Sequence, residues 1–155
     1  MKMIKRLLFA FLLCLIIPSM SLAVGTVTPT TKYQSVAGSG YGLTQITLAW
    51  TADAAAGTVP STDFVLCGTI QRMVTNPGTT APTASYDISL TDADGIRLDA
   101  TTLDNRHTTT TEQVILNIAG SAGGFQQMTH CGTVTFALSG NSVNSATGTL
   151  IIYLR

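Results

Sequence analysis

The residues with the clearest capacity for chemistry are four aspartates in the middle of the chain. Their carboxylates are the oxygen ligands that Ca²⁺ prefers, and a calcium site needs about six to eight oxygens. An EF-hand loop that began at the first turn aspartate would need further ligands where the chain has Ile96 and Leu103. Tight-turn chemistry also explains the Asp and Gly residues of the segment 92–95. We therefore predict no metal or other cofactor here, and we interpret these aspartates as turn and strand residues: Asp87, Asp92, Asp94 and Asp99.

Histidine, serine and glutamate offer the remaining routes to catalysis. His107 and His130 are the only histidines, and a zinc site would need two more ligands at a workable spacing. None of the serines lies in a G-x-S-x-G or S-x-x-K motif, which would supply an activated nucleophile. A paired-carboxylate glycosidase site is an open alternative, although a small domain with a single Glu is a poor host for one. We predict that the protein is not an enzyme.

Two segments hold candidate contacts for a glycan or a protein partner. The first is the G-S-G-Y-G segment around Tyr41, and the second is the polar loop 101–111 with Asp104, Arg106 and His107. Aromatic side chains could also form a sugar platform, but Trp50 alternates in phase with other apolar residues and is expected in the core. The same argument places Tyr86 in the core.

The first 23 residues have the three parts of a secretory signal peptide. A basic start (Lys2, Lys5, Arg6) precedes the apolar run 7–17, and Ser21-Leu22-Ala23 has the small residues of a cleavage site. The alternative is a membrane anchor, but the run is short of the roughly 20 residues that span a bilayer. Cleavage would remove three of the eight Lys and Arg residues and no acidic residue, which leaves a net charge of about −3. We expect export to the periplasm, the cell surface or the medium, and no nucleic-acid partner.

Two cysteines, Cys67 and Cys131, would remain after cleavage. An oxidising compartment favours a disulfide between them, and the alternative is a pair of buried free thiols. In the chain-entropy picture a bond that closes a loop of about 64 residues stabilises the fold by roughly 4 kcal/mol.

The rest of the chain reads as an all-β domain, a β-sandwich of roughly seven to eight antiparallel strands that is Ig-like or jelly-roll-like. No segment after the leader has a helical apolar period, and turn signals separate short alternating runs. We divide the chain into the signal peptide 1–23, an N-terminal arm 24–43 that pairs with an edge or stays mobile, and the sandwich domain 44–155. The expected strands are 32–36 within the arm, then 44–51, 64–74, 86–91, 112–118, 133–138 and 147–154.

Two further expectations concern a bulge in the strand 64–74 and an additional strand after 86–91. Alternation slips near Cys67-Gly68, which indicates a bulge. After the turn at 92–95, a return strand is expected with Ile96 and Leu98 inward and with Arg97 and Asp99 facing solvent.

Four segments resemble a family of small β-rich proteins from the structural gene clusters of tailed phages and prophages. They are 46–57, 75–95, 104–114 and 139–153, and the most specific is the Pro-rich loop followed by Y-D-I-S-L-T-D-A-D-G. The resemblance implies a virion-associated structural protein and transfers no catalytic residue. The leader and the two cysteines depart from that pattern and favour an exported version.

These observations predict a non-enzymatic structural or assembly protein that associates with itself or with other structural proteins. Charged residues make up only 10% of the chain, which suits a module packed into an assembly. The alternative is an exported periplasmic or cell-surface module that binds a glycan or a protein through its loops. The membrane would be met only through the leader, before cleavage.

Overall fold

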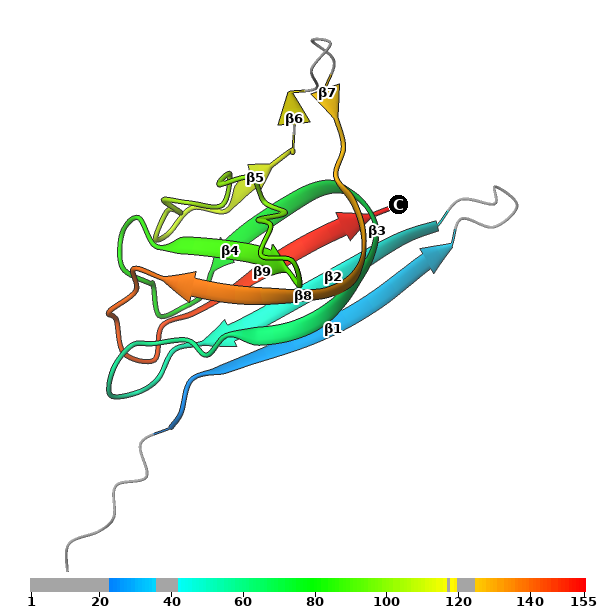
Figure 1. Cartoon of the computed structure of the whole chain (residues 1–155). Helices are drawn as coiled ribbons and strands as arrows, with labels where there is room; N and C mark the ends of the chain where they lie inside the picture. The colour runs from blue at the N-terminus through cyan, green and yellow to red at the C-terminus, as the bar shows by residue number, and fades with distance from the viewer. Residues whose placement is uncertain (1–22, 36–41, 117, 120–124) are drawn as a thin grey trace, which may run out of the picture.

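The computed structural model describes residues 23–35, 42–116, 118–119 and 125–155 (Figure 1). The predicted signal peptide therefore lies outside the described residues, except for Ala23. The described residues form strands, turns and loops without a helix, which confirms the all-β prediction. The strands are β1 Thr26–Ser35, β2 Gly42–Thr51, β3 Thr62–Pro77, β4 Asp87–Asp92, β5 Glu112–Val114, β6 Ile118–Ala119, β7 Phe125–Gln126, β8 Thr129–Ser139 and β9 Thr147–Leu154.

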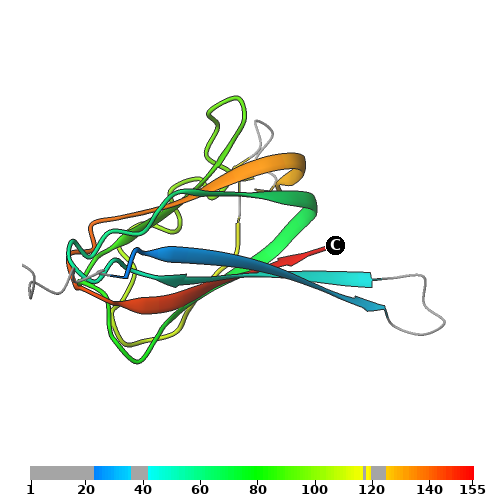
Figure 2. The ribbon, with the colours of Figure 1, turned by 90° about the horizontal axis from the view of Figure 1, so that it is seen from below.

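One antiparallel sheet of seven strands dominates the structure. Its order is β1-β2-β9-β3-β8-β4, with β5 paired to β3 on the side away from β9, while β6 and β7 form a separate pair. β3 belongs to both halves of this sheet, because Thr62–Thr69 pairs with β8 and the segment from Ile70 to Pro77 pairs with β9. The sheet therefore folds over at β3 into two layers, with β1, β2 and β9 in one and β8 with the first half of β3 in the other (Figure 2).

The bend in β3 occurs at a glycine and an irregular pairing. Gly68 has φ +144°, a conformation that L side chains rarely adopt, and a Cβ there would approach the Arg155 carbonyl oxygen to 3.1 Å. The register against β9 shifts between Ile70 and Arg72. The bulge expected at Cys67-Gly68 is thus found three residues further along, with Gly68 supplying the backbone conformation that precedes it.

The core lies between the two layers and follows the alternation of the strands. Every second residue of β9 from Gly148 to Leu154 is buried, as are the even-numbered residues from Ile46 to Trp50 in β2. Trp50 is 2% exposed, and its ring lies against that of Tyr86 with 5.9 Å between centroids. The core positions predicted for Trp50 and Tyr86 are confirmed.

The strand expected at 32–36 in the N-terminal arm is longer than predicted. β1 runs from Thr26 to Ser35 and pairs with β2 over its full length, from Thr26↔Thr51 to Ser35↔Gly42. It forms the outer strand of one layer (Figure 1). Position 36 lies outside the described residues.

The predicted return strand after β4 is wrong in three respects. The chain makes a single bridge, Thr91↔Arg97, and leaves strand geometry, with φ of +46° at Ala100 and +64° at Thr101. Asp99 was expected to face solvent but is fully buried. Ile96 was expected inward but is 56% exposed, because period-two alternation does not hold outside a strand.

The strand expected at 112–118 is divided between β5 and β6. Leu116, between them, is buried as expected from its phase, and Val114 is half-buried against the core.

Candidate functional site

β1 and β4, the two ends of the six-strand path, differ in what lies beside them. On β4, the backbone groups that point away from β8 belong to the even-numbered residues, and segment 96–106 provides hydrogen-bond partners for them. These bonds are Arg106 N to Tyr86 O (2.7 Å), Ile88 N to Leu103 O (3.0 Å), Leu90 N to Asp99 Oδ1 (3.0 Å), Leu98 N to Leu90 O (2.7 Å), Asp92 N to Ile96 O (3.0 Å) and Arg97 Nη2 to Ile88 O (3.2 Å). The β4 edge is therefore closed to a further strand.

A three-residue ion-pair group, the Arg97 brace, holds this closing segment in place. Arg97 Nη2 contacts Asp99 Oδ2 at 2.5 Å and Asp104 Oδ1 at 2.7 Å. Hydrogen bonds to Asp99, and then to Asp104, raise the pKa of Arg97 above its ordinary value. Leu98 and Leu103 are buried beneath the segment. Asp104, a candidate loop contact from the sequence, therefore uses its carboxylate to bind Arg97.

Arg106 and His107, also candidate contacts, shape the same loop. Arg106 donates from Nε and Nη2 to the Asp104 carbonyl oxygen, and its Nη1 lies 3.5 Å from Glu112 Oε2. His107 is exposed, but its Nδ1 accepts hydrogen bonds from the backbone N–H groups of Thr109 (3.1 Å) and Thr110 (3.0 Å). The structure brings Asp104, Arg106 and His107 together as loop supports, and Tyr41 lies outside the described residues.

The aspartates considered for calcium act separately in this structure. Asp92 Oδ1 accepts from the N–H groups of Asp94 and Ile96, and Asp87 Oδ1 accepts from that of Asn105. Among the described residues there is no group of three or more His, Cys, Asp or Glu side chains that could hold a metal ion. Asp92 is the turn residue that the sequence interpretation expects, whereas Asp99 is buried and binds Arg97.

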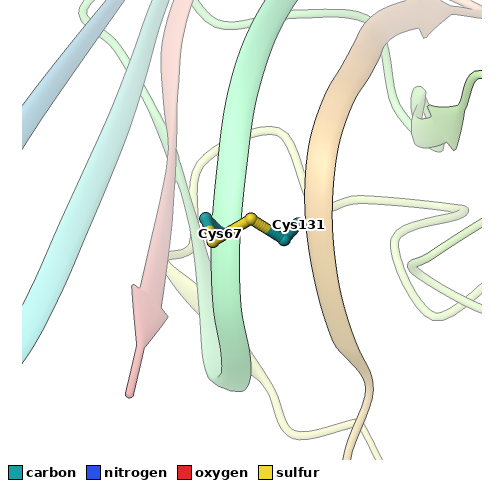
Figure 3. The surroundings of a disulfide bond; sticks show 2 residues. All are labelled: Cys67 and Cys131. Carbon is teal, nitrogen blue, oxygen red and sulfur yellow. A yellow bond between two sulfur atoms is a disulfide. The ribbon is translucent and has the colours of Figure 1, made fainter.

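The predicted bond between Cys67 and Cys131 is present and joins β3 to β8 (Figure 3). The two residues are direct partners in the antiparallel register. Both are exposed, so the bond lies on the outer face of its layer and outside the core.

In contrast to β4, no described strand pairs with the outer side of β1. Nine of its ten residues are exposed, and Tyr33 is 70% exposed. Its only charged residue is Lys32. A ten-residue edge of this kind offers a row of backbone donors and acceptors to another strand.

Proline on β1 shows which of its residues face outward. Pro29↔Leu48 and Thr28↔Ala49 are both paired in the β1–β2 ladder. Proline has no N–H, so both pairings can form only if the backbone of Pro29 faces away from β2. Because direction alternates along a strand, the outward backbone groups belong to the odd-numbered residues: Val27, Pro29, Thr31, Tyr33 and Ser35.

The sequence predicted only the end of this strand, at 32–36, with edge pairing of the arm as one alternative, because β1 lacks the apolar alternation of a half-buried strand. The available signal was a run of β-favouring Thr, Val and Tyr residues with one proline, a residue that sheets tolerate on edges.

Comparison with protein-family models, curated proteins and solved structures found no match to this chain. The resemblance to phage structural proteins therefore stays a prediction. None of the described residues belongs to a helix long and apolar enough to cross a membrane.

Proposed function

We propose that this chain is a non-enzymatic structural module that joins an assembly by strand pairing along β1. The observation that carries the proposal is the contrast between the two edges: segment 96–106 closes β4, whereas β1 offers ten residues to a partner. Strand addition of this kind takes its affinity from main-chain hydrogen bonds. A sparsely charged edge suits it, because little charge must be removed from water.

The assembly we propose is a virion or a phage-derived particle, reached by a chain that is exported first. The resemblance in the sequence supports the phage origin. The disulfide supports export, since such bonds persist in oxidising compartments. The signal peptide 1–23 and an exported location remain part of the same proposal.

The alternative, a module that binds a glycan or protein through its loops, has less support. Asp104 and Arg106 were its main polar groups, and both are occupied within the loop. The exposed ring of His107 is left as a weak basis for recognition.

Mass spectrometry of gradient-purified particles and of envelope extract from one culture tests the proposed function. We expect peptides of this chain in the particles, with a mature N-terminus at Val24. Peptides confined to the extract would overturn the virion assignment and favour the loop-binding alternative. Peptides in the particles that include the leader would overturn the proposed export.

A further inference from the structure

We infer that the partner of the β1 edge is the β1 edge of a second copy, antiparallel about a two-fold axis at Thr31. This inference rests on the proposed function and names its partner. The two sheets would join into one continuous sheet across the axis.

The edges favour a closed pair over a filament. A filament of identical units needs two different complementary surfaces on each unit, such as β1 of one copy against β4 of the next. The Arg97 brace and segment 96–106 occupy the β4 edge. Among the described residues β1 offers the longest side without a paired strand, ten residues against three in β5. Pairing β1 with β1 uses the same surface on both copies, which is the isologous arrangement of a two-fold dimer.

Only the odd-numbered residues of β1 have backbone groups that face outward, and this restricts the registers that the dimer can adopt. Residues that face outward on one copy must lie opposite outward-facing residues on the other. Odd-numbered β1 residues therefore pair with odd-numbered residues, and the axis passes through a residue position.

Hydrogen bonds then separate these registers, because Pro29 accepts but cannot donate. With Thr31 opposite Thr31, Pro29 lies opposite Tyr33 and Val27 opposite Ser35. This register forms about eight hydrogen bonds between copies. Shifting the axis by one residue in either direction leaves about six.

Charge acts in the same direction. With the axis at Thr31, Lys32 lies opposite Thr30 of the second copy. With the axis at position 32, Lys32 would lie opposite itself, and like charges directly across a strand pair are destabilising. Lys32 therefore destabilises the register with its axis at position 32 and is compatible with the axis at Thr31.

Sedimentation velocity over a concentration series tests the dimer, with the full gene product purified in the form that cells accumulate. The decisive variant is Thr31→Pro, which removes one outward N–H from each copy and leaves the β1–β2 ladder intact. We expect the dimer dissociation constant to rise about thirtyfold, through two lost hydrogen bonds. Thr31→Val keeps the N–H and is expected to match the wild type. An equal effect of both variants, or a wild type that stays monomeric at every concentration, would overturn the inference.

Cross-linking tests the register. In the inferred dimer, Thr31→Cys places two thiols directly opposite each other, within the range that a disulfide spans. Thr28→Cys places them roughly 20 Å apart, on either side of the axis. We expect covalent dimers from the first variant alone under mild oxidation. Covalent dimers from the second variant, or from neither, would overturn the Thr31 axis.

The outcomes also distinguish this inference from the proposed function. A monomer that is nevertheless found in particles overturns the second copy as partner and leaves the structural role standing. A dimer that is absent from particles supports the pairing of β1 and overturns the virion-associated role.

Discussion

The carboxylate of Asp99 accepts a hydrogen bond from the backbone N–H of Leu90 at 3.0 Å, so that a buried side chain stands where a neighbouring strand would place a carbonyl. The same carboxylate binds Arg97. One residue therefore satisfies the edge of β4 and anchors the segment that covers it. This relationship explains how the fold protects the β4 edge, whereas no described strand pairs with the outer side of β1.

Removing Asp99 should destabilise the fold more than its place in a loop suggests. Asp99→Ala leaves the buried N–H of Leu90 without its acceptor and takes a partner from Arg97, so we expect unfolding free energy to fall by about 3 kcal/mol. Asp99→Asn retains an acceptor and should cost less. Urea unfolding measures both, and exposed Asp94→Ala is the control, expected within about 0.5 kcal/mol of wild type. Equal losses for Asp99→Ala and Asp94→Ala would contradict the role of Asp99.

The disulfide should stabilise the protein through the unfolded chain. The bond is exposed and spans 64 residues of sequence, so its loss should lower the unfolding free energy by about 4 kcal/mol without opening the core. Replacing Cys67 and Cys131 together by alanine is compared with reduction of the wild type, by urea unfolding and tryptophan emission. A double variant as stable as the oxidised wild type would count against this account.

Gly148 is expected to be intolerant of a side chain. A Cβ there would lie 2.5 Å from the ring of Trp50 and 3.1 Å from the carbonyl oxygen of Asn76. Gly148→Ala should therefore displace the buried indole and cost about 1 to 3 kcal/mol, with a changed near-UV circular dichroism spectrum. Gly132→Ala in β8 is the control, because its Cβ would meet only the ring of His130, at 3.2 Å. Equal stability of the two variants would contradict the close packing of Gly148 against Trp50.

The raised pKa of Tyr86 predicts a loss of stability at alkaline pH. Burial, aided by the charge of Glu112 and opposed by that of Arg106, raises the pKa of Tyr86 to about 12. The phenol ionises near pH 10 in the unfolded chain but stays protonated in the native state, so its contribution is present below pH 10 and is lost as pH rises toward 12. Over this range the wild type should lose roughly 2 kcal/mol more than Tyr86→Phe. Parallel stability curves for the two proteins would show that Tyr86 does not titrate in this way.

The parts of the fold that sequence predicted are those governed by local alternation. β9 begins and ends where its pattern does, and Trp50 and Tyr86 are buried because each lies in phase with apolar neighbours. The bond between Cys67 and Cys131 was predicted because an exported chain would keep only these two cysteines in an oxidising compartment. The departure from strand geometry after Asp99 could not be predicted, because two non-glycine residues, Ala100 and Thr101, adopt positive φ there. Such conformations are uncommon for these residues and leave no signal in the sequence.

The candidate site was harder to predict than the fold. Loop polarity suggested Asp104, Arg106 and His107 as contacts, but polar loop residues also bind their own backbone, and tertiary structure decides which they do. The open edge of β1 is a property of the sheet order, since it depends on which strands lie outermost. The position of Pro29 became informative only once its pairing with Leu48 was known.

Hydrogen–deuterium exchange, resolved by residue and repeated at low and high protein concentration, tests the central claim most directly. The account predicts that the N–H groups of Ile88, Leu90 and Asp92 are protected at every concentration. Backbone carbonyls of segment 96–106 bind the first and the last, and the Asp99 carboxylate binds that of Leu90. It predicts that the outward N–H groups of Val27, Thr31, Tyr33 and Ser35 exchange quickly in dilute solution and gain protection as the protein associates. Fast exchange of these β1 amides in a fully associated sample would contradict the claim that β1 is the edge through which the protein assembles.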